Sequence, residues 1–498
     1  TQGAYERFGS TVTQVNQFRG VSNYQSMYGQ VTVDYKTKIN GVHSVSGSLF
    51  ADMGEVLDNF LLPEKPANIN LDAKYDYQNK YFAQAAVSRS YSNRLAPDKR
   101  WGTFYAFGLG WDISKENFLS DVEWLDKFKL RGVFGETGNS AAGYFTWKQQ
   151  YSNDINNGVW YDHGSGYGTW LAGSANGINE VNNALANPYV SWERAHKLNI
   201  GFDLNLFDNR LWITTDLYRD KYFDLLRQRG KTIELIGLTY PAENIGKNLY
   251  KGVEIAVTYQ DNVADFNYYV TGNWNLNHSE IVYMDEQNVP FDYLRRTGRP
   301  VGTVYGLVAE GFFQSTEEIA NSAVIAGETI VPGDLKYKDL NGDGVIDEFD
   351  QKVIGGDKPI SYFGLNLGFE YKGIEVSAMF QGVYNREIYL PDGGNEFTTG
   401  FSKFLGDYGQ AYEHIIDRWT PETAETALFP RLSAGLGEYN NRPNGMSNSF
   451  WLRSANYIRL KNLNVAYTLP EGLSRKYLGG AKVKFFVTGQ NLWTQSAC

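Results

Sequence analysis

The sequence predicts an all-β fold, a transmembrane antiparallel up-and-down β-barrel, and three observations lead to this prediction. Apolar and polar residues alternate over long stretches of the 498-residue chain. Short connections rich in Asn, Asp and Gly take turns along the chain with very long ones. Aromatic residues make up 15% of the chain and 52 residues are glycine, whereas disordered chains contain few aromatics.

Composition excludes several other classes of protein. The net charge is −10 and Lys and Arg form no run, so a nucleic-acid binder that tracks phosphates is not expected. Cys498 is the only cysteine, which rules out a disulfide framework. No stretch approaches the roughly 18–20 apolar residues of a spanning helix. The opening TQGAYERFGS lacks the pattern of a signal peptide, so we expect the sequence to be a fragment cut at both ends.

Alternation with a period of two marks the individual strands. It is clearest over residues 198–206, 266–276 and 363–371, where every second residue is apolar, as in a strand with one apolar and one polar face. The alternating stretches are about 10–15 residues long, well above the usual five or six of globular proteins. About fourteen strands are predicted, near residues 24–37, 42–53, 68–77, 80–92, 101–113, 127–138, 194–206, 210–225, 249–260, 265–279, 361–372, 374–386, 453–468 and 482–493.

The connections between these strands differ in length in a regular way. Tight turns are predicted at Asn40–Gly41, Asn79, Asp208–Asn209, Val263–Ala264 and Lys372–Gly373, most with residues that turns favour. Long connections are predicted near 139–193, 226–248, 280–360 and 387–452. Short periplasmic turns on one rim and long extracellular loops on the other are typical of membrane barrels. A large soluble all-β domain stays open as the alternative.

Several stretches together resemble the SusC/RagA-like branch of TonB-dependent outer-membrane transporters. They are RWGTFYAFGLGWDISKENFL from Arg100, KLRGVFGETGN from Lys129, NIGKNLYKGVEIAVTY from Asn244, GDLKYKDLNGDGVID from Gly333, GLNLGFEYKGIEVSAMFQGVY from Gly364, WLRSANYIRLKNLNVAYTLP from Trp451 and VTGQNLWT from Val487. The similarity covers nearly the whole chain, and the order of the pieces is more specific than any one piece.

This resemblance implies an outer-membrane location and a barrel of 22 strands around an N-terminal plug. It also implies energy from TonB and a surface lipoprotein of the SusD type that helps to capture glycans or peptides. Residues 1–498 would then form the C-terminal two-thirds of the barrel, with residues 280–360 as one extracellular loop. About seven strands would be missing at the N-terminus and one at the C-terminus. The plug, the TonB-contacting segment and the closing strand are absent from the sequence.

The stretch DLNGDGVIDEFD, residues 339–350, has the ligand spacing of an EF-hand calcium loop. The expected ligands are the side chains of Asp339, Asn341, Asp343, Asp347 and Asp350 and the carbonyl of Val345. Asp350 replaces the usual bidentate Glu, and no helix pair is predicted to flank the loop. We expect calcium to act here as a structural staple, because this connection of about 80 residues is expected to have little core of its own. An Asx-turn loop without metal is the alternative.

Aromatic residues in the 139–193 connection suggest a substrate site. Exposed rings can stack on sugars and neighbouring polar groups can bond hydroxyls, and the alternative is that these rings only pack the loop or a partner lipoprotein. The residues predicted to bind substrate are Trp160, Tyr161, Asp162, Tyr167 and Trp170.

No signature of catalysis is found. The five histidines are scattered, no HExxH is present, and Gly164-Ser165-Gly166 is not a nucleophile elbow. The chain is therefore not expected to be an enzyme, and the resemblance implies that it forms the wall of an active transporter. A soluble, β-rich carbohydrate-binding or adhesion module is the alternative. The two are distinguished by whether Leu198, Ile200, Phe202, Phe363, Leu365 and Leu367 face outward in one band or pack against a second sheet.

Overall fold

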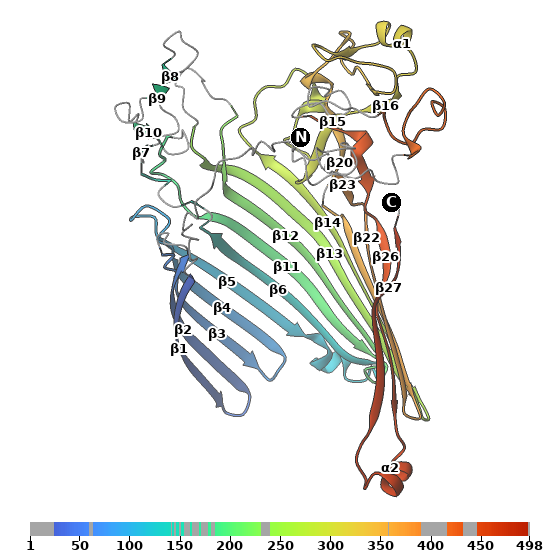
Figure 1. Ribbon diagram of the computed structural model, residues 1–498. Helices are drawn as coiled ribbons and strands as arrows, with labels where there is room; N and C mark the ends of the chain where they lie inside the picture. The colour runs from blue at the N-terminus through green and yellow to red at the C-terminus, as the bar shows by residue number, and fades with distance from the viewer. Residues whose placement is uncertain are drawn as a thin grey trace, which may run out of the picture.

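A single curved sheet of fourteen strands forms the body of the molecule. The computed structural model describes residues 24–496 apart from 59–62, 141, 144–145, 149–150, 154–159, 162–168, 171–177, 181–184, 231–239, 357, 390–415 and 432–445. In Figure 1 a layer of loops covers the upper end of the sheet and short connections lie at the lower end. We call these the loop end and the turn end.

The strands pair antiparallel and stand in the sheet in the order in which they occur along the chain. Strand labels skip where small strands lie in the loops. The fourteen strands are β1 (Tyr24–Ile39), β2 (His43–Asp58), β3 (Ala67–Tyr77), β4 (Tyr81–Tyr91), β5 (Trp101–Asp112), β6 (Leu125–Asn139), β11 (Glu193–Leu206), β12 (Leu211–Arg227), β13 (Glu243–Val263), β14 (Phe266–Tyr283), β21 (Ser361–Tyr371), β22 (Ile374–Tyr384), β26 (Tyr457–Thr468) and β27 (Lys484–Ser496).

All fourteen predicted strands are confirmed, with differences only at their ends. β13 begins at Glu243, six residues before the predicted start, and β14 continues to Tyr283. Pairing between these two strands continues to Lys247 and Tyr283, so hydrogen bonding extends them past the alternating pattern. β26 begins at Tyr457 because residues 452–454 form a separate short strand, β25.

The predicted tight turns adopt the backbone that their residues favour. Asn40 and Gly41 have positive φ values of 50° and 74°, and Asp208 and Asn209 have 57° and 58°. Successive residues with positive φ match the twist of a two-stranded hairpin, and Asn, Asp and Gly adopt them most readily. Lys372 also has a positive φ, 46°, directly before Gly373. These turns therefore fix the register of the hairpins that they close.

Two connections at the turn end contain short helices that the alternating pattern did not indicate. Residues 113–119 hold two 3₁₀ turns, η1 (Ile113–Lys115) and η2 (Asn117–Leu119). Helix α2 (Glu471–Tyr477) lies between β26 and β27, and Figure 1 shows it projecting below the sheet. In the described residues no helix is long and apolar enough to cross a membrane.

The two faces of the sheet have opposite character. Of the six residues in the test, Leu198, Ile200 and Leu365 are exposed, at 38%, 54% and 37% of their surface. The other three, Phe202, Phe363 and Leu367, are half-buried. Every second residue from 198 to 206 is apolar and lies on this face. At ~3.3 Å per residue and a strand tilt of ~40°, this nine-residue stretch spans roughly 23 Å along the barrel axis. All the long strands belong to this one sheet, so within the described residues no second sheet of similar size covers the apolar face. The predicted outward band is therefore confirmed.

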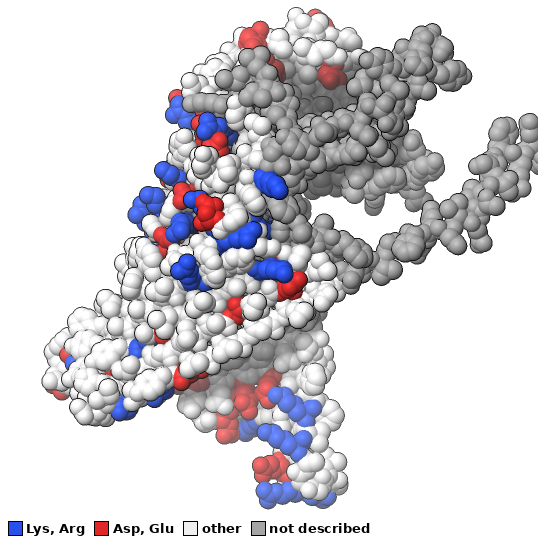
Figure 2. Space-filling view, turned by 90° about the vertical axis from the view of Figure 1, so that its left-hand side faces the viewer, with Lys and Arg blue, Asp and Glu red and all other residues white. Residues whose placement is uncertain are grey.

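Charged side chains are unevenly spread along the height of the molecule. Figure 2 shows Lys, Arg, Asp and Glu gathered in the upper part of the visible face and again at its lowest tip, with a sparsely charged area between. This distribution agrees with an apolar zone between two polar ends.

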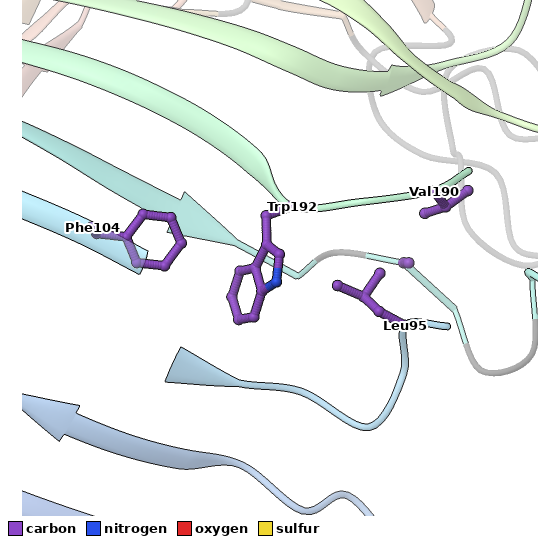
Figure 3. Close-up of a cluster of buried hydrophobic side chains, with 5 residues drawn as sticks. Leu95, Phe104, Val190 and Trp192 are labelled. Atoms are coloured by element: carbon purple, nitrogen blue, oxygen red, sulfur yellow. The ribbon is translucent and has the colours of Figure 1, made fainter. Parts of the chain in front are cut away.

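A small aromatic core anchors the loop end to the sheet. Phe104 of β5 packs at 5.5 Å, centroid to centroid, on the edge of Trp192, which precedes β11. Leu95, Ala142 and Val190 complete the cluster, and Figure 3 shows Phe104, Leu95 and Val190 around Trp192. The Trp192 indole N–H donates to the Lys99 carbonyl at 3.0 Å. Two separate connections are thus held at the base of the loop layer.

Glu116 joins two neighbouring connections at the turn end. Its carboxylate pairs with Lys80 and accepts hydrogen bonds from the Tyr81 hydroxyl at 2.7 Å and the Trp111 indole at 2.9 Å. These hydrogen bonds lower the pKa of Glu116 from 4.5 to about 2.

This lowered pKa predicts a pH-dependent stability. A folded-state pKa below the unfolded value stabilises the fold above pH 4.5, and this contribution is lost as the pH falls through about 2. Glu116→Gln should therefore lower the melting temperature at neutral pH, and the difference from the unaltered protein should shrink between pH 4.5 and about 2. The control is Glu123→Gln at an exposed position. A constant difference across this range would contradict the assignment.

Candidate functional site

The loop layer above the sheet is a folded unit with a core. It contains β15 (Thr303–Leu307), β16 (Ala309–Phe312), α1 (Thr316–Ala320), β17 (Val324–Ile325), β18 (Leu335–Tyr337), β19 (Val345–Ile346) and β20 (Lys352–Gly356). Leu307, Leu335, Tyr337 and Ile346 are almost fully buried together. The expectation that this long connection has little core of its own is therefore wrong. Apolar residues in short strands supply that core, and their two- to five-residue runs are too brief to show periodicity.

A second connection completes this unit. β24 (Ser447–Asn448) pairs parallel to β15, and β23 (Glu387–Tyr389) pairs with β25 (Leu452–Ser454). The turn η8 (Ser449–Trp451) is capped by Asn448, whose side-chain oxygen accepts from the amides of Phe450 and Trp451 at 3.1 and 3.3 Å. Trp451 is fully buried. We call the described parts of residues 284–360 and 385–456 the cap.

A buried ion pair also joins these two connections. Asp334 is 1% exposed, and its carboxylate accepts from Arg431 Nε at 2.7 Å and Nη2 at 3.3 Å. Asp334 also accepts from the amide of Val331 at 3.0 Å. Breaking such a pair by removing one partner is strongly destabilising, because a buried charge is left uncompensated. The sequence offered no signal for this contact between residues 97 positions apart.

The predicted calcium loop lies in the cap, on the loop end as expected. Its first half is a series of Asx turns. Asp339 accepts from the amides of Gly342 and Gly344 at 2.6 and 2.9 Å, and Asp343 accepts from Val345 at 2.9 Å. Gly342 and Gly344 have φ values of 77° and 85°, a backbone that favours glycine.

The second half of the loop is a capped turn. η6 (Glu348–Asp350) is capped by Asp347, whose side chain accepts from the amide of Phe349 at 2.8 Å. Asp350 is fully buried and accepts from the amides of Leu340 and Asp347 at 2.7 and 3.0 Å. Asp350 thus joins the two ends of the motif. In the part of the chain that the structure describes, no group of three or more Asp, Glu, His or Cys side chains is arranged to hold a metal ion.

The charges of the loop act together on one neighbouring side chain. Burial and the negative charges of Asp350, Asp339, Asp343 and Asp347 raise the pKa of Tyr293. The Tyr293 hydroxyl is buried and has no hydrogen-bond partner among the described residues. Its ring stacks on Phe291 at 5.1 Å, and Phe291 contacts Phe349 of η6. The motif is therefore a concentrated source of negative potential beside a buried phenol.

The residues predicted to bind substrate are only partly described. Trp160 and Tyr161 form β8 (Trp160–Tyr161), which pairs antiparallel with β9 (Thr169–Trp170) so that Trp160 lies opposite Trp170. Asp162 and Tyr167 lie outside the described residues. The backbone therefore brings three of the five predicted residues into one small ribbon at the loop end.

The inner, polar face of the sheet carries ion pairs that the sequence reasoning did not single out. Arg131 of β6 forms a two-pronged pair with Asp216 of β12 and approaches Asp203 of β11 at 3.5 Å. This pair crosses β11 above Gly201, where an added Cβ would lie 2.9 Å from Arg131 Cζ and 2.8 Å from Asp216 Oδ1. The sequence did contain a signal for these ion pairs: each neighbouring strand has a charged residue at a position on its polar face.

The inner face is also hollowed near the turn end. A cavity of about 670 Å³ has Arg210, Asp261, Glu370 and Glu375 in its lining. Arg210 pairs with Asp261 at 3.3 Å, and Lys484 pairs with Glu375 at 2.6 Å. A cavity lined by paired charged side chains can contact water or polar groups.

Comparison with known proteins places this sheet among membrane barrels. No family model matches the chain. A TonB-dependent receptor of Formosa agariphila is 28% identical over 433 residues, which cover 84% of this chain and 40% of the relative. The TonB-dependent receptor SusC of Bacteroides thetaiotaomicron is 24% identical, with 84% of this chain and 39% of the relative covered. The chain thus spans about two-fifths of the curated relatives that it matches.

Solved structures show the same fold. The structure of the RagAB peptide transporter matches with a TM-score of 0.68 and 20% identity, covering 95% of this chain and 52% of that one. The RagAB peptide importer in its open-open state matches with a TM-score of 0.70 and 19% identity, over the same shares of the two chains.

Proposed function

This chain is part of the β-barrel of a SusC/RagA-like TonB-dependent receptor of the outer membrane, and on that premise we propose that the whole protein imports an oligosaccharide or a peptide. The energy would come from TonB, through parts of the protein outside this sequence. A SusD-like surface lipoprotein would assist capture. The observation that carries the proposal is the sheet itself, with an exposed apolar face outside and paired charges inside. This family comprises transporters and not enzymes, in agreement with the prediction from the sequence.

The soluble alternative, a carbohydrate-binding or adhesion module, does not fit this sheet. Such a module would pack Leu198, Ile200 and Leu365 against a second sheet, whereas these side chains are exposed. Monomeric soluble proteins rarely expose apolar patches larger than a few hundred Å².

Uptake by cells tests the proposal directly. Cells with the full-length protein should accumulate a labelled oligosaccharide or a labelled peptide, and accumulation should fall to background when the gene or TonB is deleted. Supplying the two substrates separately decides between them. Accumulation that is independent of TonB would contradict active transport.

A partner lipoprotein is supported by relatives and by the cap. The sheet shares its fold with the RagAB peptide transporter, and the cap offers a folded surface at the loop end. Affinity purification of the tagged full-length protein from native membranes should recover a lipoprotein in constant ratio. Recovery of the transporter alone under mild detergent would contradict this part of the proposal.

We also propose that calcium binds residues 339–350. The residues present supply hard oxygen ligands at the spacing that calcium loops use. Asp339, Asn341, Asp343, Asp347, Asp350 and the Val345 carbonyl would hold the ion. Because the carboxylates accept amide hydrogen bonds, their remaining lone pairs would have to turn toward the ion.

Calcium titration distinguishes this proposal from a metal-free Asx-turn loop. At a hundredfold excess over Kd, calcium should stabilise the cap by about 2.7 kcal/mol, seen as a higher melting temperature and slower proteolysis. Asp339→Asn with Asp343→Asn should abolish the effect. Asp292→Asn, at an exposed acid near the loop, is the matched control. If calcium changes neither measurement, the metal-free loop is correct.

We further propose that the substrate is contacted by Trp160, Tyr161, Asp162, Tyr167 and Trp170. The support is their residue types and the pairing of Trp160 with Trp170 across one ribbon. If these residues bind substrate, Trp160→Ala with Trp170→Ala should raise the half-saturating substrate concentration for uptake without changing the amount of protein in the membrane. An unchanged value would leave packing as their role.

A further inference from the structure

On the apolar outer face of the sheet, five neighbouring strands change to ionisable side chains at nearly the same level. Going toward the loop end, the apolar run on β12 ends at Leu217 and that on β13 ends at Val253. The next positions on the same face are Glu136 of β6, His196 of β11, Arg219 of β12, Lys251 of β13 and His278 of β14. Further toward the loop end the same face carries both charged and apolar residues, Lys221 and Phe223 on β12 and Leu249 on β13.

Basic side chains meet directly at this boundary. Arg219 lies opposite Lys251, and Lys251 lies opposite His278 on the next strand. Lys221 follows Arg219 two residues further along the same face. All four residues are exposed. Like charges directly opposite each other on one face of a sheet destabilise it, so this arrangement calls for a negative partner.

The chain does not supply that partner within its described residues. No ion pair joins Arg219, Lys221 or Lys251 to an acid there. Glu280 lies on the same face beyond His278 but forms no ion pair with these residues in the described part. Glu136 is already paired with Arg194 and lies 2.9 Å from His196.

The inner face of the same strands is different, and the contrast indicates where the partner comes from. Asp216 is paired with Arg131 and Asp220 is paired with Lys197 at 3.7 Å. Charges that face inward on β12 are thus matched by neighbouring strands, whereas the outward charges Arg219 and Lys221 are not. Within the described residues no neighbouring strand supplies an outward partner at this level, where the outer face of a membrane barrel meets its surroundings.

We propose that Arg219, Lys221 and Lys251 form a docking site for the phosphate-bearing headgroup of a lipid in the outer leaflet. The loop end faces the outside in barrels of this kind, and the three side chains lie just beyond the apolar band, at headgroup level. A phosphate monoester carries up to two negative charges, so it can lie between Arg219 and Lys251 and relieve their repulsion. The acyl chains would then lie along the apolar surface below.

Lipid exchange with the full-length protein tests the proposal. The protein is purified in a neutral detergent and titrated with mixed micelles that contain either phosphatidic acid or diacylglycerol, and bound lipid is measured. Arg219→Gln with Lys251→Gln should weaken phosphatidic acid binding about 30-fold, which is about 2 kcal/mol, and leave diacylglycerol unaffected. A second double variant, Arg219→Lys with Lys251→Arg, keeps both positive charges and should bind phosphatidic acid as the unaltered protein does. The control Lys476→Gln with Lys482→Gln makes the same charge change at the exposed turn end.

Stability gives a second, independent readout with opposite signs. In neutral detergent Arg219→Gln with Lys251→Gln should raise the melting temperature, because it removes repulsion. With phosphatidic acid present the same variant should melt below the unaltered protein, because it loses the bound headgroup. Equal weakening of lipid binding by the turn-end control would overturn the proposal. So would inorganic phosphate binding as tightly as phosphatidic acid, since the site would then take a free anion.

Discussion

Trp451→Ala is expected to unfold the cap while the fourteen-stranded sheet stays assembled. Trp451 is fully buried and its ring meets Phe450 edge-on at 4.8 Å, at the point where η8 joins the two halves of the cap. Truncating a buried Trp to Ala removes about 3–5 kcal/mol. Because the cap has a buried core of its own apart from the sheet, most of that loss should appear as local opening.

Two measurements distinguish unfolding of the cap from unfolding of the sheet: limited proteolysis, and gel mobility in detergent with and without heating. Cleavage of Trp451→Ala should concentrate in residues 284–360 and 385–456, while the folded barrel keeps its mobility in detergent. Trp124→Ala makes the same chemical change at an exposed position near the turn end and should behave like the unaltered protein. If Trp451→Ala melts the whole barrel at once, the cap is not a separate unit.

Gly201→Ala is expected to destabilise the barrel wall by about 3 kcal/mol, because it combines overpacking with a weakened ion pair. The added Cβ would lie 2.6 Å from the carbonyl oxygen of Thr215 and 2.8 Å from Asp216 Oδ1. The carbonyl belongs to the neighbouring strand and cannot move without disturbing the pairing of β11 and β12. The added methyl group would also occupy the space over Gly201 through which Arg131 reaches Asp216.

A matched glycine on the adjacent strand provides the control. Gly132 of β6 has nothing within 4 Å of an added Cβ, so Gly132→Ala should leave the denaturant midpoint unchanged. Chemical unfolding of both variants, followed by tryptophan fluorescence, gives the comparison. Equal behaviour of Gly201→Ala and Gly132→Ala would show that the close approach at Gly201 carries no energetic weight.

The strands were predictable because their signal is local. Alternation over Leu198–Leu206 and turn residues such as Asn40–Gly41 each report on a few neighbouring positions, and both are confirmed. The cap was not predictable from such signals. Its strands are short, and its key contacts join distant segments, as Asp334 meets Arg431 and Asn448 donates to the Tyr337 hydroxyl at 3.4 Å.

The candidate sites show the same division. The spacing of residues 339–350 correctly placed a turn-rich, oxygen-lined loop, because Asx turns form within a few residues. The buried setting of Asp350 depends on the core below it and could not be seen in the motif. The opposition of Arg219 and Lys251 depends on strand register, which the alternating pattern alone does not fix between residues 32 positions apart.

The order of the strands in the sheet, which is the order of the sequence, has a consequence for how such a protein can change over time. Each strand needs only its sequence neighbours to pair, whatever length of chain lies between them. Lengthening a connection about sixfold, as from residues 113–124 to residues 284–360, costs only about 1.6 kcal/mol of closure entropy. New surface segments can therefore be inserted at the loop end without changing the pairing of the strands. Descendants of one barrel can then diverge in what they recognise while the membrane-spanning strands stay nearly the same.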